Sequence, residues 1–189
     1  MIFSDEACFQ LMPTRRRTLA PRGETPKLMA WDKRGKISVI GAITISPKTG
    51  KKGFLFQMLP ADLNFNGNLI VEFLRFLRYH VAGPIKLIWD GAPIHRAKVV
   101  TRFLSEQTRI ETFRLPAYAP DTNPVEGCWG HAKYHQLANL VVKNAEELRE
   151  RAKESLNKIK QDRGLIKSFI KHAHDRKQQT SRLLLCSTQ

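Results

Sequence analysis

The sequence has few cysteines, no long hydrophobic run and no apolar leader. Its 3 cysteines lie far apart in the 189 residues, at positions 8, 128 and 186, and form no CxxC pair. An odd number of isolated cysteines is typical of reduced thiols, not of a disulfide-stabilised secreted scaffold. No apolar run approaches the roughly 18 residues of a membrane span. Asp5 and Glu6 interrupt the region where a signal peptide would be apolar. We therefore expect no membrane partner and a cytoplasmic location.

Acidic residues are scarce relative to basic ones. The chain has 32 Lys and Arg against 17 Asp and Glu, a net charge of +15 with a pI near 10.1. Residues 13–52 alone hold 11 Lys and Arg but only 2 Asp and Glu, a balance that cannot be buried without an anion. This excess favours nucleic acid as the partner, which in a prokaryote means the nucleoid. The residues expected to contact phosphate are Arg15, Arg16, Arg17, Arg22, Lys33, Arg34 and Lys133.

The hydrophobic pattern predicts an α/β fold in one domain. The β-branched run 37–46 (ISVIGAITIS) indicates a buried strand, and apolar residues four apart in 69–81 indicate an amphipathic helix. The order βββαβαβα, followed by further helices, predicts a mixed five-stranded sheet flanked by helices. This order matches the ribonuclease-H-like fold. We place the domain at 1–177 and a flexible tail at 178–189. The predicted strands are 2–11, 37–46, 53–59, 85–89 and 109–115, and the predicted helices are 64–81, 97–107, 124–137, 144–162 and 165–175.

The chain has no Walker loop, GxGxxG or GxSxG motif. Its candidate catalytic residues are instead three carboxylates. Asp5 lies in the first strand, Asp90 directly follows strand 85–89, and Glu126 opens a helix after a Pro-rich loop. In α/β sheets, ligand sites lie at the carboxyl ends of strands. The 35 residues between Asp90 and Glu126 suffice for a helix, a strand and a return to the same rim. We therefore take these three as candidate catalytic and metal-binding residues.

Clustered carboxylates of this kind favour phosphoryl transfer with divalent metal. Their hard oxygens suit Mg²⁺ or Mn²⁺. Two such ions about 3.5–4 Å apart activate the attacking oxygen and stabilise the leaving one. One carboxylate that bridges both ions, with one more on each, is the simplest arrangement. Without a cation the carboxylates would repel one another. The surrounding positive charge would hold a DNA backbone against the acidic pocket.

Each candidate also has a purely structural explanation. Asp5 could be a surface strand residue, and Asp90 begins an Asp-Gly pair, which is common in turns. Asn123 and Glu126, with the proline between them, match the N-cap, first position and third position of a capping box. Asn123 is therefore a site-adjacent candidate. His95, five residues after Asp90, is another, with helix capping as its alternative.

A zinc site is the weaker alternative for the helix that contains Glu126. Cys128, His131 and His135 share one neighbourhood, and the two histidines are four residues apart. No second pair of ligands follows at the spacing of a zinc site. Trp129, between them, is expected in the core. The helix 144–162 alternates charges of opposite sign, which is typical of a salt-bridged cover and not of a DNA-reading helix.

Three segments resemble the acidic motifs of DDE transposases. They are residues 2–7 (IFSDEA), 88–95 (IWDGAPIH) and 115–126 (LPAYAPDTNPVE), of which the last, followed by Trp129 and Lys133, is the most specific. The stretches RRRTLAPRGETP and ISVIGAIT add to the likeness. The chain is similar, over roughly residues 1–175, to insertion-sequence transposases of the mariner superfamily.

The resemblance implies a ribonuclease-H-like core with two divalent ions held by Asp5, Asp90 and Glu126. It implies cleavage of DNA at element ends, then attack of the freed 3′-OH on target DNA, in a homodimeric complex. Such transposases carry an N-terminal helix-turn-helix region that reads the element ends. Met1 lies only four residues before Asp5, so we expect that region to be absent here.

Two other functions stay open at this point. A ribonuclease-H-like nuclease would hydrolyse DNA without strand transfer. A truncated DNA-binding regulator of transposition would have no catalytic activity. The intact triad favours an enzyme, and the missing N-terminal region favours a regulator or an incomplete enzyme.

Overall fold

The computed structural model describes residues 1–24, 27–28, 35–116 and 122–186, with side chains up to residue 176. Five strands form one mixed sheet: β1 Ile2–Gln10, β2 Lys36–Ile45, β3 Lys52–Met58, β4 Ile85–Trp89 and β5 Ile110–Arg114. Their order is β3-β2-β1-β4-β5. The first three strands pair antiparallel, whereas β4 and β5 run parallel to β1. The predicted mixed five-stranded sheet is confirmed.

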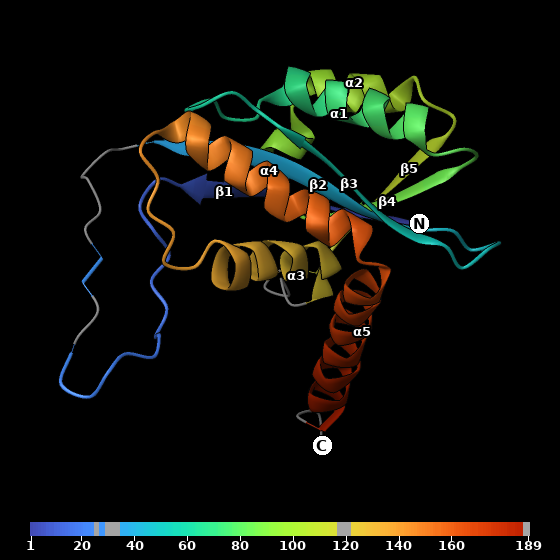
Figure 1. The fold of residues 1–189 in the computed structure, drawn as a ribbon. Helices are drawn as coiled ribbons and strands as arrows, with labels where there is room; N and C mark the ends of the chain where they lie inside the picture. The colour runs from blue at the N-terminus through green and yellow to red at the C-terminus, as the bar shows by residue number, and fades with distance from the viewer. Residues whose placement is uncertain (25–26, 29–34, 117–121, 187–189) are drawn as a thin grey trace.

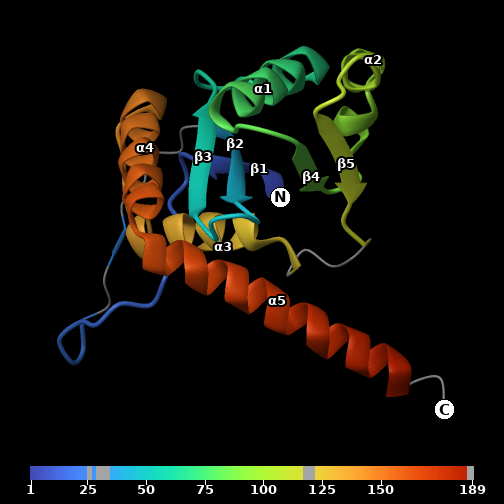
Figure 2. The same cartoon turned by 90° about the vertical axis from the view of Figure 1, so that its right-hand side faces the viewer.

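Helices cover both faces of this sheet (Figures 1 and 2). On one face lie α1 (Gly67–His80) and α2 (Lys98–Ser105), and the short 3₁₀ helix η1 (Pro93–Arg96) precedes α2. On the other face lie α3 (Pro124–His131) and α4 (Ala145–Gln161), with a π-helical turn, η3 (Ala132–Gln136), directly after α3. Each face has its own apolar core, with Phe73 and Leu74 in the first and Trp129 and Leu156 in the second.

The last helix, α5 (Arg163–Cys186), is longer than predicted. Its first turns pack on the body of the domain through Ile166, which is fully buried, and Phe169, while the rest projects away from the sheet (Figure 2). The sequence prediction ended this helix at 175 and placed a flexible tail at 178–189. The structure instead continues the helix to Cys186, because residues 176–186 contain no proline or glycine to end it. Residues 187–189 lie outside the described part.

The other boundaries agree with the prediction to within a few residues. Strand β4 has the predicted bounds, and α1 begins three residues later than predicted because the side chain of Asn66 caps it by accepting from the Leu69 amide. The predicted helix 124–137 divides into α3 and η3. Among the described helices, none is long and apolar enough to cross a membrane.

Candidate functional site

The site lies where β4 ends beside the middle of β1. The parallel register pairs Ile2 with Leu87 and Phe3 with Ile88. Continued by two residues, it brings Asp90, the first residue after β4, level with Asp5. Side chains of a strand alternate between its faces, so Asp5 lies on the same face as Phe3, which packs against the α3–α5 core. The sheet therefore brings together two of the three predicted carboxylates.

The third carboxylate is placed by the start of α3. The side chain of Asn123 caps this helix by accepting from the Val125 amide at 3.2 Å, and Pro124 occupies the first turn. The same side chain donates through Nδ2 to the backbone carbonyl of Ser4, at 3.2 Å. Asn123 is buried, so it ties the first turn of α3, and with it Glu126, to the residue before Asp5. The predicted N-cap is confirmed, and this bond to β1 explains why Asn123 lies beside the site.

A tryptophan of α3 holds Asp5 directly. Trp129 is buried, as the sequence predicted, and its indole Nε1 donates to Asp5 Oδ2 at 2.9 Å. Gly41, the partner of Asp5 on β2, leaves room for the ring, since a Cβ at that position would lie 2.6 Å from Trp129 Cη2. This role of Trp129 was not predicted, because a buried tryptophan N–H usually finds an acceptor but the sequence does not say which one, and Asp5 lies 124 residues away.

The neighbouring carboxylates change the acidity of Asp5. Burial, together with the negative charges of Glu126, Glu6 and, to a smaller extent, Asp90, raises the pKa of Asp5 to about 8, against the opposing hydrogen bond from Trp129. Such mutual repulsion is relieved by a cation. A set of carboxylate oxygens gathered on one rim therefore suits Mg²⁺ or Mn²⁺, the metals that prefer hard oxygen ligands.

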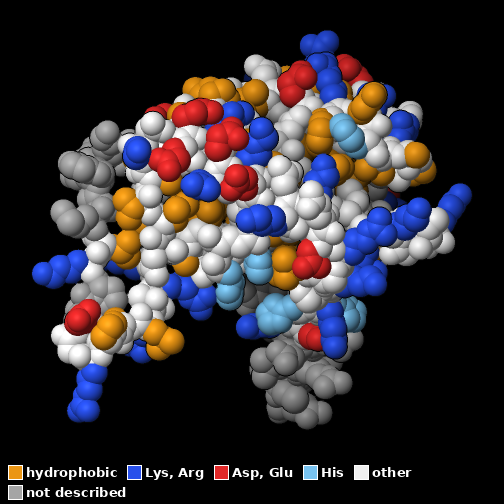
Figure 3. Space-filling model, viewed as in Figure 1, with side chains coloured by type: hydrophobic (Ala, Val, Ile, Leu, Met, Phe, Trp, Pro, Cys, Tyr) orange, Lys and Arg blue, Asp and Glu red, His pale blue; other side chains and the backbone are white. Residues whose placement is uncertain are grey.

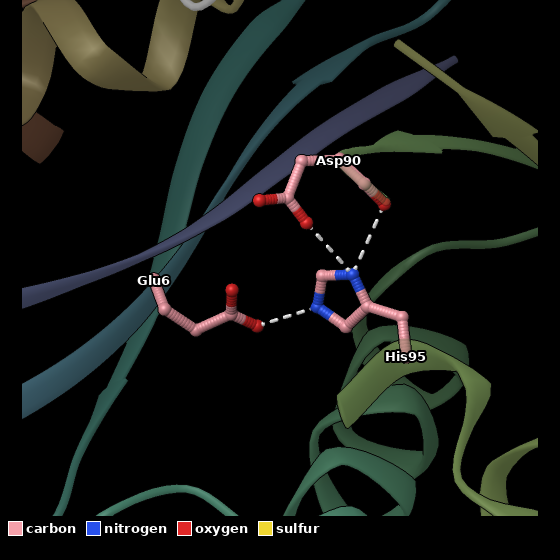
Figure 4. A group of neighbouring side chains, drawn as sticks. All are labelled: Glu6, Asp90 and His95. Atoms are coloured by element: carbon pink, nitrogen blue, oxygen red, sulfur yellow. Dashed lines mark hydrogen bonds and ion pairs between the residues drawn. The ribbon is translucent and has the colours of Figure 1, made fainter. Parts of the chain in front are cut away.

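A second cluster lies on the other side of Asp90 (Figure 4). His95 Nε2 lies 2.9 Å from Glu6 Oε1, and His95 Nδ1 lies 3.0 Å from Asp90 Oδ1 and 3.2 Å from the Asp90 carbonyl oxygen. The imidazole stacks on the Trp89 indole with ring centroids 4.1 Å apart and planes 4° from parallel. Burial would lower the pKa of His95, but its interactions with Glu6 and Asp90 outweigh burial and raise it.

This cluster differs from the predicted triad. Among the residues that the structure describes, the one group of three or more His, Cys, Asp or Glu ligand atoms within 4.8 Å of one another is Glu6, Asp90 and His95. Asp5, Asp90 and Glu126 share the rim, but their ligand atoms do not all lie within that distance. In a two-ion site they need not, because the outer carboxylates bind different ions. Glu6 was missed because it alternates to the face opposite Asp5, and its only signal was its place next to Asp5 in the first motif.

The basic residues predicted to bind phosphate lie mainly on the segment after β1. Arg15, Arg17 and Arg22 are exposed there. Arg16 is exposed as well, but its Nη1 donates to the Tyr134 carbonyl at 2.8 Å, and its backbone exchanges two hydrogen bonds with the Asn139 side chain. The structure therefore gives Arg16 an anchoring role that the sequence did not predict.

The remaining predicted phosphate contacts have different outcomes. The ammonium of Lys133, a half-buried residue, lies 5.7 Å from the centre of the Phe9 ring. Lys33 and Arg34 lie outside the described residues. Phosphate contact by any of these side chains stays a prediction.

A groove of about 760 Å³ lies beside Glu126, between α3 and α5. Its lining includes His131, His135 and His172, and Figure 3 shows histidines gathered there below the mixed charges of α4. The rings of His131 and His135 stack with centroids 5.1 Å apart. Cys128 is instead buried in the core, and burial raises its thiol pKa. These three residues therefore form no zinc cluster in the described part of the chain.

Comparison with known proteins agrees with this architecture. The sequence profile of the DDE superfamily endonuclease family matches residues 1–149. The transposable element Tc3 transposase of Caenorhabditis elegans is 28% identical over 137 residues, which are 69% of this chain and 40% of that protein. The fold is similar to the Mos1 mariner paired-end complex with Mn, with a TM-score of 0.68 and 19% identity over 93% of this chain and 52% of that one.

The isolated catalytic domain of Mos1 mariner transposase is similar as well. Its TM-score is 0.57 at 16% identity, over 93% of this chain and 77% of that one. The chain spans about two fifths of the Tc3 transposase and about half of the Mos1 chain in the paired-end complex.

The order of the sheet strands and the helices on both faces define a ribonuclease-H-like fold, which the chain shares with the Mos1 structures. Within that fold class, the chain belongs to the DDE superfamily endonuclease family, whose sequence profile matches residues 1–149.

Proposed function

We propose that this domain cleaves DNA phosphodiesters at transposon ends and joins the resulting 3′-OH to target DNA. The observation that carries the proposal is the position of Asp5, which Trp129 holds on the rim shared with Asp90 and Glu126. Asp5, Asp90 and Glu126 would hold two Mg²⁺ or Mn²⁺ ions. When bound, these ions supply charge neutralisation at the attacking and leaving oxygens of an in-line displacement.

The protein's own residues supply position and charge. Asn123 and Trp129 fix the start of α3 against β1, so that the carboxylates are held on rigid elements before substrate arrives. The net charge of +15 attracts the DNA backbone toward an acidic rim that would otherwise repel it. Both steps are displacements at phosphorus, so one rim serves cleavage and joining.

The similar solved structures support the metal and the partner. One is described as a Mos1 paired-end complex with Mn, and others as the Mos1 catalytic domain with raltegravir and either Mn or Mg. We propose by analogy that this domain uses Mg²⁺ or Mn²⁺, binds transposon ends and target DNA, and works as a homodimer on paired ends.

Strand transfer separates this function from simple hydrolysis. The chain is incubated with a labelled oligonucleotide that ends in a 3′-OH, a supercoiled plasmid and Mn²⁺ or Mg²⁺. Covalent attachment of the label to the plasmid, absent in EDTA and with a 3′-deoxy oligonucleotide, is expected of a transposase. Metal-dependent nicking without attachment would instead indicate a nuclease. DNA binding without either reaction would indicate a regulator.

A further inference from the structure

The imidazole of His95 is fixed on three sides. Its side chain is 3% exposed, its plane is stacked on Trp89, and its two nitrogens face Glu6 and Asp90. Carboxylate and carbonyl oxygens accept hydrogen bonds, so both nitrogens are placed to donate. A buried ring that is stacked and bonded at both nitrogens has one orientation. His95 therefore links β1 rigidly to the loop after β4, and we call the arrangement of Glu6, His95 and Asp90 the bracket.

The fixed orientation of His95 restrains the side chain of Asp90. Its side chain is 51% exposed and follows the end of a strand, so by itself it would rotate. Oδ1 instead accepts a hydrogen bond from the Ala92 amide at 3.0 Å and lies 3.0 Å from His95 Nδ1 as an ion pair, while the same nitrogen donates to the Asp90 carbonyl oxygen at 3.2 Å. Figure 4 shows the second carboxylate oxygen pointing away from the imidazole. The bracket fixes one oxygen and leaves the other available to a ligand.

Glu6 completes the bracket from the other face of the sheet. It belongs to the strand that carries Asp5, and its Oε1 holds the far nitrogen of the ring at 2.9 Å. His95 thus links Asp90 to β1, the same strand that carries Asp5. Residues that hydrogen-bond a metal-binding carboxylate fix its orientation and strengthen metal binding.

We propose that Glu6 and His95 are positioning residues that orient Asp90 for a divalent cation, an inference that rests on the proposed function. Neither residue is assigned here as a metal ligand, because both nitrogens of His95 and one oxygen of Glu6 are already used within the bracket. Loss of such a partner typically costs about 10–100-fold in metal affinity or activity.

The test is plasmid nicking as a function of Mg²⁺ concentration for wild type, Glu6→Gln and His95→Gln, with the thermal midpoint of each protein. We expect the Mg²⁺ concentration at half-maximal nicking to rise by about 10–100-fold in both variants, with the rate at saturating Mg²⁺ largely retained. Glu6→Gln keeps the side chain's size but removes the negative charge that pairs with the imidazole 2.9 Å away, so it should weaken the hold on His95 while keeping the fold. Glu72→Gln, on the exposed surface of α1 and paired with Arg75, is the matched control.

An unchanged half-maximal Mg²⁺ concentration in Glu6→Gln would overturn the inference. So would complete loss of nicking at every Mg²⁺ concentration with an unchanged thermal midpoint, because Glu6 would then act directly at the metal. Failure of the proposed function looks different: wild type itself would nick without metal, or nicking would survive Asp90→Ala.

Discussion

Asp5 is the residue in which stability and function oppose each other. Burial by the surrounding core, together with the negative charges of the nearby carboxylates, raises the pKa of Asp5 to about 8, from 3.8 in an unperturbed chain. Between those pH values the folded chain holds a proton that the unfolded chain has lost. The stability that this group contributes is therefore complete below about pH 4 and is lost as pH rises toward 8.

Asp5→Asn should therefore stabilise the metal-free protein while it abolishes nicking. Thermal unfolding in EDTA at pH 5 and pH 8 measures this. We expect the wild-type midpoint to fall more than that of the variant between the two pH values, and the variant to unfold a few degrees higher at pH 8. Mn²⁺ should then raise the wild-type midpoint and leave that of Asp5→Asn nearly unchanged. Equal pH dependence of the two proteins would contradict the raised pKa that burial and the neighbouring carboxylates give Asp5.

Between elements, the decisive contact is the close approach of α3 to the middle of the sheet. Gly41 on β2 makes it possible, because its missing side chain leaves the space that the Trp129 ring fills. The same ring holds Asp5, and the Asn123 cap holds the first turn of α3 to β1. The packing of α3 on the sheet therefore also sets the position of the carboxylates at the site.

Gly41→Ala should disturb both the packing of α3 on the sheet and the geometry of the site. The added methyl would lie 2.6 Å from Trp129 and 3.0 Å from Phe54, two buried rings that cannot move freely. Overpacking of this kind costs about 1–3 kcal/mol, and we expect nicking to fall as Trp129 is pushed from Asp5. Urea unfolding and plasmid nicking measure the two effects.

Gly130→Ala is the matched control for this substitution. It changes the next residue of α3, where a Cβ meets no atom within 4 Å. It should leave both quantities unchanged or raise stability slightly. A Gly41→Ala protein as stable and active as this control would show that the close approach is not required.

Over the whole molecule, two exposed regions differ in charge: residues 13–24 are mainly basic, whereas α4 carries charges of both signs. Residues 13–24 carry several exposed arginines, and their backbone is anchored to the loop after η3 by hydrogen bonds between Arg16 and Asn139. On α4, Arg and Glu form ion pairs along the exposed face, as in the pair Arg149 and Glu146. We expect DNA to contact the basic segment and not α4.

The triple substitution Arg15→Gln, Arg17→Gln and Arg22→Gln should weaken DNA binding and reduce its salt dependence. Each lost phosphate contact lowers the slope of log K against log salt by about 0.9. Fluorescence anisotropy with a duplex at several salt concentrations measures this slope. The control removes the same charge from α4, through Lys153→Gln, Lys158→Gln and Lys160→Gln, all exposed. Equal slopes for both triple variants would place the DNA elsewhere.

Local signals predicted the elements well, and contacts between distant residues escaped them. The apolar run of β4 and the Asn123 cap follow from neighbouring residues, so the sequence sufficed. The contact of Glu6 with His95 joins residues 89 positions apart across a sheet, and nothing local specifies it. The anchoring of Arg16 escaped for the same reason, since its partners lie 118 or more residues away. The predicted helix ended at 175, short of Cys186, because residues 177–189 (KQQTSRLLLCSTQ) were interpreted as a frayed end.

The most direct test of the central claim is nicking of supercoiled plasmid by wild type, Asp5→Ala, Asp90→Ala and Glu126→Ala, each in Mg²⁺, Mn²⁺ and EDTA. We expect wild type to nick only with metal and each variant to lose nicking by at least about 100-fold while it still binds DNA, because each removes a carboxylate from the metal site. Nicking by wild type in EDTA, or undiminished nicking by any one of the three variants, would contradict a metal-dependent site built from these carboxylates.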